Sequence, residues 1–295
     1  MELTNPADIR ALLARHDFRF SKSMGQNFLT AAWVPADIAE ASGADARTGV
    51  LEVGPGIGCL TEQLAQRAAK VVSVELDERL RPVLAETLAA YPNVEIVFGD
   101  VLALDLPQLV AERFPGLRPV VCANLPYNVT TPLITAFLTA GCFDTVTVMI
   151  QREAAHRLCA RPGTADYGLL TVLTAWYAEL ELLFDVPPHC FVPAPKVNSK
   201  VIRITLWQEK PCVPRDEAIL FRTVKAAFGQ RRKTLANALA TGYPELGKER
   251  VSKILADMGL AADIRGERLS IADFTALSDR IGEALSQTEG GNGHD

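Results

Sequence analysis

The sequence contains no apolar run that reaches the roughly 18 to 20 residues needed to cross a bilayer. Residues 1–8 also lack the basic stretch followed by an apolar one that marks an export signal. The six cysteines stand far apart without any C-x-x-C pair, and only four histidines accompany them. We therefore expect a cytoplasmic protein with reduced cysteines, no membrane association and no bound metal.

Internal repeats and low-complexity tracts are also missing. Of the 295 residues, 48% are hydrophobic and 22% are charged, which excludes a disordered chain and supplies enough apolar side chains for about two domains. Only the C-terminal end, residues 287–295, has no apolar side chain. We predict a flexible tail over residues 285–295.

The chain as a whole has no excess of positive charge, since its formal net charge is -5 and its pI is about 5.5. This excludes a protein that coats nucleic acid without specificity. The charge is unevenly distributed, however, because residues 196–235 hold ten basic and three acidic side chains, a net +7 that leaves -12 for the remainder. The asymmetry predicts one basic surface on an otherwise acidic molecule.

Short runs rich in β-branched residues alternate with helical stretches between residues 50 and 150. Such an alternation predicts a mostly parallel sheet covered by helices on both faces. The runs are VLEV at 50–53, VVSV at 71–74, VEIVF at 94–98, PVVCAN at 119–124 and TVTVMI at 145–150. Two further runs, LELLFDV at 180–186 and KVIRITL at 200–206, are expected to close the sheet as an antiparallel pair.

The β-rich runs end near residue 207, where a linker with two prolines follows. Apolar residues then recur at helical spacing from Leu220 to Leu239 and from Val251 to Met258, and glycines separate these stretches. We predict two domains, an α/β domain over residues 1–207 and a smaller all-helical domain over 208–284.

A glycine-rich turn follows the first predicted strand, with Gly54, Gly56 and Gly58 directly after VLEV. Glycines there let the backbone approach a ligand, because a Cβ would collide or forbid the positive φ angles of the turn. The spacing departs from the dinucleotide fingerprint G-x-G-x-x-G, in which the third glycine would stand at Cys59. The turn alone is therefore a weak indication of a nucleotide site.

Acidic residues end the next two strands. Glu75 ends VVSVE, where a carboxylate can accept both hydroxyls of a ribose, and Asp100 follows VEIVFG, where it can accept the amino group of an adenine or cap a helix. Because the carboxyl ends of parallel strands meet at one edge of a sheet, these acids and the glycines predict an adenosine pocket. NAD is still one candidate ligand for such a pocket.

The strand PVVCA is followed by Asn124, Leu125, Pro126 and Tyr127, which resemble the motif that amino-group methyltransferases use on adenine. The N6 lone pair of adenine is delocalised into the ring, so the site must favour a tetrahedral nitrogen. The Asn124 side-chain oxygen and the Leu125 carbonyl would accept the two N6 hydrogens and turn the lone pair toward the methyl group. Tyr127 would stack on a base flipped out of its helix or loop.

Taken together, these motifs resemble the ribosomal RNA adenine N6-dimethyltransferase family, and most of all its bacterial small-subunit branch. Five more segments carry the resemblance nearly from end to end: KSMGQNFL at 22–29, MIQRE at 149–153, VPP at 186–188, FVPAPKVNS at 191–199 and FGQRRKTL at 228–235. The resemblance implies a Rossmann-like class I methyltransferase domain with a mostly parallel sheet, followed by a small all-helical domain that binds RNA.

The same resemblance implies S-adenosyl-L-methionine as the donor and dimethylation of two adjacent adenosines in the 3′-terminal hairpin of small-subunit (16S) rRNA. The expected form is a monomer that acts on rRNA within an immature 30S particle and has a role in 30S biogenesis. Phe191, which opens F-x-P-x-P, would join residues 124–127 in catalysis by closing the other face of the base. The donor would be bound by Gln26, Asn27, Leu29, Gly54, Gly56, Gly58, Glu75, Leu76, Asp100, Val101 and Asn124.

The sequence departs from the family pattern at two positions. Met24 stands where Phe is common, which keeps an apolar residue there, and Asn198 replaces an Asp before Ser199, which weakens whatever contact that acid makes. Both changes leave methyl transfer as the expected activity.

The basic stretch at 230–233 is expected to hold phosphates of folded RNA. Arg161 could widen this surface, although each of these cations could also belong to a solvated helix face. The predicted RNA contacts are Arg152, Arg157, Lys196, Lys225, Arg231, Arg232 and Lys233.

Several other functions are compatible with parts of this pattern. Large-subunit rRNA dimethyltransferases share the motifs but tend to be more basic and often have Ile at the position of Leu125, and DNA adenine methyltransferases carry N-P-P-Y. A ribosome-assembly or transcription factor on the same fold is an alternative without catalysis as its main role. The intact Glu75, Asp100 and residues 124–127 indicate that catalysis is retained, but they do not exclude an additional assembly role. A dehydrogenase is disfavoured by Cys59 and by the absence of a proton-relay motif.

Overall fold

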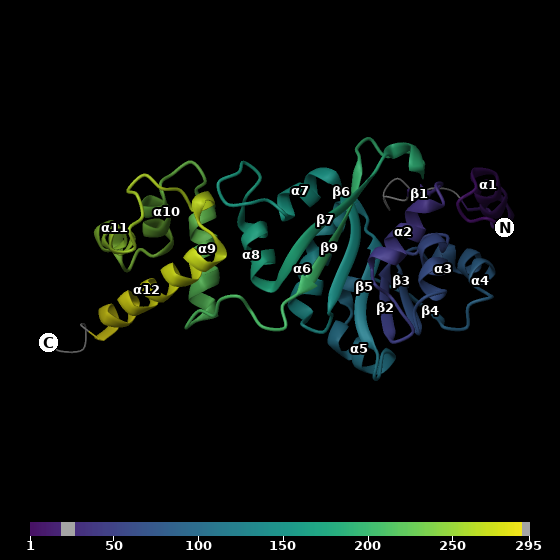
Figure 1. The fold of residues 1–295 in the computed structure, drawn as a ribbon, viewed down its shortest axis with the longest axis horizontal. Coiled ribbons are helices and arrows are strands. Elements are labelled where there is room, and N and C mark those ends of the chain that lie inside the picture. The colour runs from purple at the N-terminus through teal and green to yellow at the C-terminus, as the bar shows by residue number, and fades with distance from the viewer. Residues whose placement is uncertain (19–26, 291–295) are drawn as a thin grey trace. The chain divides into compact units, whose positions relative to one another are not determined.

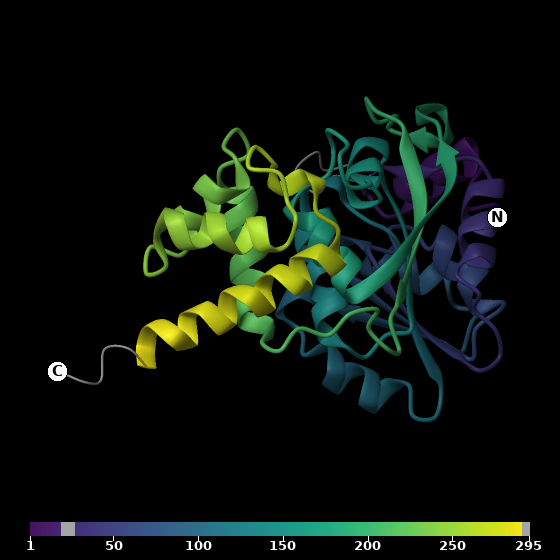
Figure 2. The ribbon, with the colours of Figure 1, turned by 60° about the vertical axis from the view of Figure 1, so that its left-hand side comes forward.

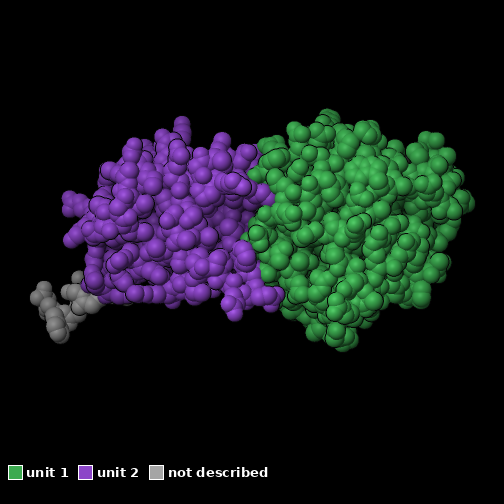
Figure 3. All heavy atoms as spheres, viewed as in Figure 1, with its two compact units in different colours: residues 1–156, 178–206 green, residues 157–177, 207–295 purple. Residues whose placement is uncertain are grey.

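A computed structural model describes residues 1–18 and 27–290, so Met24 and the predicted donor contact Gln26 lie outside the described residues. The chain forms two compact units, which Figure 3 shows in different colours. The first unit consists of residues 1–156 and 178–206, and the second of residues 157–177 and 207–295. Each unit has its own hydrophobic core.

The first unit is built on a seven-stranded sheet with the order β4-β3-β2-β5-β6-β9-β7 (Figure 1). Strands β2 to β6 pair in parallel, and β9 pairs antiparallel with β6 and β7. The bounds are β2 (Thr48–Val53), β3 (Lys70–Glu75), β4 (Val94–Phe98), β5 (Arg118–Asn124), β6 (Thr145–Gln151), β7 (Ala178–Val186) and β9 (Ser199–Leu206). All seven predicted strands, including the antiparallel pair, are confirmed.

Helices cover both faces of this sheet, which explains why its central strands β2, β3, β5 and β6 are buried along most of their length rather than alternating between buried and exposed residues. Val50 of β2 packs with Ile38 of α2 and Leu64 of α3 in one cluster, and Figure 1 shows α5 and α6 on the opposite side of the sheet. The helices of this unit are α1 (Pro6–Arg15), α2 (Trp33–Ala41), α3 (Cys59–Ala65), α4 (Arg81–Thr87), α5 (Leu106–Arg113) and α6 (Thr130–Ala140), and α7 (Arg152–Leu158) begins in it.

A small two-stranded ladder joins the N-terminal region to the segment before β9. Strand β1 (Phe28–Leu29) pairs antiparallel with β8 (Phe191–Val192), and Leu29 stands opposite Phe191. Phe28 packs with Ile57 of the glycine-rich turn and with apolar residues of α1 and α4. The ladder therefore carries the described N-terminal residues to the carboxyl edge of the large sheet.

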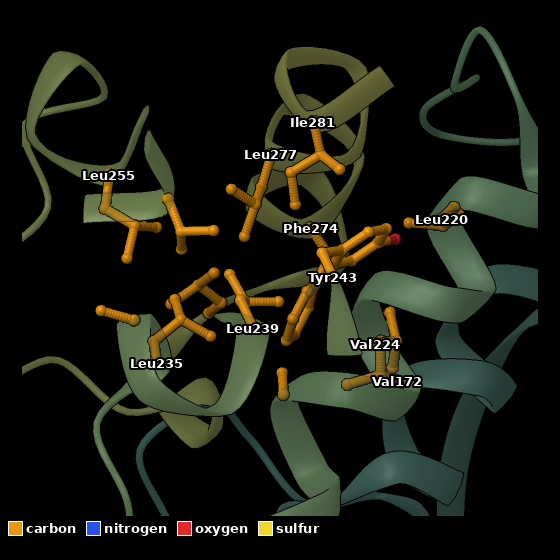
Figure 4. Packing of buried hydrophobic residues seen from close by; sticks show 14 of the residues in the cluster. Val172, Leu220, Val224, Leu235, Leu239, Tyr243, Leu255, Phe274, Leu277 and Ile281 are labelled. Atoms are coloured by element: carbon orange, nitrogen blue, oxygen red, sulfur yellow. The ribbon is translucent and has the colours of Figure 1, made fainter. Parts of the chain in front are cut away.

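The second unit is all-helical, as the periodicity of its sequence predicts. Its helices are α8 (Leu169–Tyr177), α9 (Glu217–Gly229), α10 (Leu235–Gly242), α11 (Gly247–Asp257) and α12 (Ile271–Gly290). Helix α9 packs against α8, α10 and α12, and Figure 2 shows α12 in yellow alongside it. Tyr243 and Phe274 lie among leucine and valine side chains in the core of this unit (Figure 4).

The two units divide the chain at different places from the two predicted domains. Residues 157–177, assigned above to the α/β domain, belong to the second unit because Val172 and Trp176 of α8 share its core with α9. Residues 285–290, expected in the flexible tail, are the last turns of α12. Among the described residues, no helix has the length and hydropathy of a membrane span.

Candidate active site

A cavity of about 230 Å³ opens where the parallel strands of the first unit end. Its lining includes Gly54 after β2, Glu75 at the end of β3, Asp100 after β4 and Asn124 at the end of β5. The chain turns from β2 to one side of the sheet and from β5 to the other, so the cavity lies at the topological switch point. Ligands of open α/β sheets bind at this point.

The glycine-rich turn lines this cavity, and its two cavity-lining glycines have a positive φ. Gly54 has a φ of 69°, and a Cβ placed on it would stand in open space. Gly56 has a φ of 60°, and a Cβ there would lie 3.1 Å from the Phe28 ring. The turn thus leaves room against the backbone that a ligand can fill.

Glu75 lines the cavity and is held in place in part by the glycine-rich turn. Its carboxylate accepts hydrogen bonds from the Gly56 amide at 3.2 Å and from the Asp77 amide at 2.8 Å, and the side chain is 7% exposed. Burial raises the pKa of Glu75, while the two amides act in the opposite direction. Each carboxylate oxygen keeps a lone pair for a further donor, so both can still accept a ribose hydroxyl.

Asp100 lines the cavity and also caps a turn. Its Oδ1 accepts a hydrogen bond from the Leu102 amide at 2.9 Å, which starts the 3-10 helix η3 (Val101–Ala103). Leu76 and Leu102 line the same region with exposed fractions of 57% and 42%, unusually high for leucines. An acid beside exposed apolar side chains suits a flat purine with an amino group.

Glu52 is a site residue that the sequence analysis did not single out. It lies on β2, lines the cavity and is 1% exposed. Its Oε2 accepts hydrogen bonds from Thr61 at 2.7 Å and Ser73 at 2.6 Å. Burial raises its pKa to about 7, against the effect of these two hydroxyls. An acid inside the apolar run VLEV was the available signal, and sequence patterns alone do not give its protonation state.

Residues 124–127 line the cavity at the end of β5, whereas Asp100 lines it after β4, two strands beyond β2 in the sheet. Asn124 ends β5, and the Leu125 amide donates to the Met149 carbonyl of β6 at 3.1 Å, which fixes the turn. Pro126 then starts the 3-10 helix η4 (Tyr127–Val129). Within the described residues the Asn124 side chain has no hydrogen-bond partner from the protein, so its amide oxygen is available to a ligand.

Tyr127 is fixed at both ends. Its backbone belongs to η4, and its hydroxyl is 2.5 Å from the Ser199 hydroxyl at the start of β9. Burial raises the pKa of Tyr127, so the phenol stays protonated at neutral pH. The ring is among the groups that line the cavity, which agrees with a surface for stacking a base.

Two predicted residues do not line the cavity. Phe191 is 2% exposed and packs in the core with Leu29, its partner across the β1–β8 ladder, so its ring is occupied by apolar contacts. Gly58 stands at the N-cap of α3 with a φ of 96°, where it shapes the turn without facing the cavity. Asn27, Leu29, Leu76 and Val101 line the cavity.

The predicted RNA contacts are all exposed, but they divide between the two units. Arg152 and Lys196 belong to the first unit, and the other five belong to the second. Arg231 differs from its neighbours because its guanidinium donates to the Ala165 carbonyl at 2.9 Å and to the Tyr167 carbonyl at 3.2 Å. This arginine therefore holds the loop before α8 as well as presenting charge.

The cavity residues fit a ligand built on adenosine. Glu75 suits a ribose, and Asp100 with the exposed leucines suits a purine. The open space over Gly54 continues to Asn124 and can hold the group that adenosine carries. Among residues 1–18 and 27–290, no three His, Cys, Asp or Glu side chains are grouped to hold a metal ion.

The strand order, the single reversed strand β9 and an adenosine cavity at the switch point define a class I methyltransferase of the S-adenosylmethionine-dependent type. Residues 17–281 match the model of the ribosomal RNA adenine dimethylase family, and the chain belongs to that family.

Relatives with a matching name align with this chain over nearly their whole length. The ribosomal RNA small subunit methyltransferase A of Geobacillus thermodenitrificans is 45% identical over 284 residues, 95% of this chain and 97% of that protein. The protein of the same name from Bacillus licheniformis is 44% identical over 289 residues, 96% of this chain and 99% of that protein.

Two solved structures share the fold. The 23S rRNA methyltransferase ErmE has a TM-score of 0.68 and 29% sequence identity, covering 87% of this chain and 100% of that chain. A dimethyladenosine transferase from Plasmodium falciparum has a TM-score of 0.73 at 22% identity, with 87% and 98% covered.

Proposed function

We propose that this protein transfers methyl groups from S-adenosyl-L-methionine to the N6 amino groups of two adjacent adenosines near the 3′ end of small-subunit rRNA. One observation carries the proposal: a single cavity joins the adenosine-binding residues to the Asn124 side-chain amide, which has no hydrogen-bond partner among residues 1–18 and 27–290. The high identity to small-subunit methyltransferases favours this substrate over large-subunit rRNA, on which ErmE acts.

The residues at the donor end of the cavity bind S-adenosyl-L-methionine and take no part in the chemical step. Glu75 accepts the ribose hydroxyls, Asp100 accepts the adenine amino group, and Leu76 and Leu102 contact the purine faces. The bound donor supplies a methyl group activated on a sulfonium centre. Because Glu75 is itself oriented by the Gly56 amide, donor binding and the conformation of the turn depend on each other.

The acceptor end orients a poor nucleophile. The Asn124 side-chain oxygen and the Leu125 carbonyl accept the two N6 hydrogens, so the nitrogen lone pair is aimed out of the plane of the base. Tyr127 stacks on the base, and stacking of this kind contributes about 1 to 3 kcal/mol, comparable with the cost of unstacking. The proton leaves the ammonium product to solvent, which removes the need for a protein base.

The rRNA outside the target adenosines is bound by the cations of the second unit. Arg232 and Lys233 are exposed, and no ion pair joins either of them to another described residue. Phosphate contacts of this kind position a folded RNA without reading its sequence. An immature 30S particle, which presents rRNA in a defined shape, is therefore the proposed substrate form, and a monomer the proposed acting form.

Nucleoside analysis of RNA methylated in vitro tests this function. The purified protein is incubated with S-adenosylmethionine and with 30S particles that lack the modification, and with naked 16S rRNA and 23S rRNA in parallel. We expect N6,N6-dimethyladenosine in 16S rRNA from the particles and none in 23S rRNA. Dimethyladenosine confined to 23S rRNA, or none in any RNA, would contradict the proposal.

A further inference from the structure

The hydrogen bond between Tyr127 and Ser199 connects the acceptor end of the cavity to a strand that has no other part in the site. Ser199 is 0% exposed, and its hydroxyl lies 2.5 Å from the phenol oxygen of Tyr127. The serine stands 72 positions after the tyrosine in the sequence. The contact is therefore a product of the fold and not of local chain geometry.

The strand that carries Ser199 is rigid. Ser199 is the first residue of β9, and it pairs with Gln151 of β6 on one side and with Val186 of β7 on the other. Next to it, the Asn198 carbonyl accepts a hydrogen bond from the Arg152 amide at 2.9 Å. A hydroxyl on such a doubly paired strand has little freedom to follow a moving partner.

The Tyr127 ring is attached to the backbone at one end only, so its far end, which carries the phenol oxygen, needs a separate support. Pro126, with φ of -59°, restricts the backbone just before Tyr127. That leaves rotation about the Cα–Cβ bond, which would swing the ring and with it a stacked base. A hydrogen bond at the phenol oxygen holds the far end of the ring and restrains this swing.

We propose that Ser199 is a positioning residue for methyl transfer, which fixes the position of the Tyr127 ring in the cavity and so orients the adenine toward Asn124. The inference rests on the proposed function, because it concerns the base that this site methylates. A tilted base would present its N6 hydrogens poorly to the Asn124 oxygen and the Leu125 carbonyl. Loss of the serine hydroxyl is therefore expected to lower kcat and to leave donor affinity unchanged.

A double-mutant cycle tests this inference with Ser199→Ala, Tyr127→Phe and the double variant, assayed on 30S particles with the donor in excess. Each single variant is expected to lower kcat about 3- to 10-fold, the range of one neutral hydrogen bond. The double variant is expected to be no slower than the singles, because both remove the same contact. The dissociation constant for S-adenosylmethionine is expected to stay within about twofold of the parent value.

Two further variants separate positioning from loss of structure. Ser199→Thr keeps the hydroxyl and is expected to recover most of the kcat lost in Ser199→Ala. Thr147→Val removes another fully buried hydroxyl from the same sheet, one without a hydrogen-bond partner among the described residues, and is expected to keep the parent kcat.

Additive losses in the cycle, or an unchanged kcat in Ser199→Ala, would overturn the positioning role while leaving the proposed function intact. The parent protein serves as the reference for the function itself. If the parent makes no dimethyladenosine on any RNA, the proposed function fails before the cycle is measured.

Discussion

At the scale of single residues, the site is defined by which oxygens are already in use. Both oxygens of Glu75 accept backbone amides, and one oxygen of Glu52 accepts two hydroxyls. The Asn124 amide has no protein partner among the described residues. The two carboxylates are thus held in place by the protein, whereas the Asn124 amide is fully available to a substrate.

Replacing Asn124 with Ala removes the acceptor at the reaction end. We expect kcat to fall by a factor of about 100 or more, the effect of losing one preorganised transition-state contact. Donor affinity should weaken by less than about tenfold, because Glu75, Asp100 and the glycine turn remain. Initial rates on unmodified 30S particles and calorimetric titration with S-adenosylmethionine measure the two effects. Comparable rates for the variant and the parent would refute the role of Asn124.

Glu52 makes the stability of the protein depend on pH. Its folded-state pKa of about 7 lies above the ordinary value of 4.5, so the folded state binds the proton more tightly than the unfolded state. This contribution is complete below about pH 4.5 and is lost as the pH rises through 7, a change of about 3 kcal/mol. Glu52→Gln should remove it.

Urea midpoints at pH 5 and pH 8 measure this dependence. The parent midpoint should fall over this interval by more than the Glu52→Gln midpoint. Glu112→Gln, which changes an exposed acid in α5, is the matched control and should behave like the parent. An identical fall in all three proteins would show that Glu52 does not titrate in this range.

At the scale of elements, the strand ends and the turns after them build the cavity. Gly56 belongs to the turn after β2; its positive φ strains any side chain there, and a Cβ would press against the Phe28 ring at 3.1 Å. Gly116, in the turn before β5, has a φ of 73° and open space around it. The two glycines share a backbone requirement and differ only in their neighbours.

Gly56→Ala and Gly116→Ala therefore separate backbone strain from ligand binding. Both should lose about 1 to 2 kcal/mol of stability, because alanine is strained at positive φ. Only Gly56→Ala should weaken donor binding, by about tenfold or more, because its Cβ must displace the Phe28 ring that lines the cavity. Equal donor affinities for the two variants, measured by calorimetry, would contradict the proposed position of the donor.

The edge strands β4 and β7 are only partly buried. The central strands β2, β3, β5 and β6 were predictable because each is a β-rich run that is buried along most of its length. The pairing of Phe28 and Leu29 with residues 191 and 192 was not, since two-residue strands leave no periodic pattern. Phe191 shows the same limit at the site: the motif F-x-P-x-P predicts an aromatic contact, but only the fold reveals that the ring packs against Leu29. Neighbouring side chains, and not the motif, determine what such a ring contacts.

The sequence motifs predicted where the candidate site lies, but not the protonation of its acids or the contacts that hold its side chains. Glycines and acids at consecutive strand ends predicted where the cavity lies, because parallel strands bring their ends together. The raised pKa of Glu52 and the contact between Tyr127 and Ser199 depend on burial and on distances across the sheet. The grouping of residues 157–177 with the second unit likewise depends on packing between helices that are distant in sequence.

At the scale of the whole molecule, we propose that an acidic protein binds a polyanion through a local excess of basic residues. The exposed cations of the second unit are not equivalent, since Arg231 also bonds to two carbonyls of the loop before α8. Removing Arg231 is expected to lower stability as well as RNA affinity. Arg232 and Lys233 are the cleaner test of phosphate binding.

The double variant Arg232→Gln with Lys233→Gln should weaken binding to 30S particles and reduce the slope of log affinity against log salt by about two, or one for each contact. Lys248→Gln with Lys253→Gln removes the same charge from α11 and is the matched control, which should keep the parent slope. Filter binding over a range of salt concentrations gives both slopes. An unchanged slope in the first variant would exclude these residues from the RNA contact.

The most direct test of the central claim is mass spectrometry of 16S rRNA from cells that lack this protein, complemented with the parent gene or with the Asn124→Ala variant. We expect the two adjacent dimethyladenosines to be absent without the protein, to return with the parent and to stay absent with the variant. Dimethyladenosine that persists without the protein, or that returns with Asn124→Ala, would contradict the account.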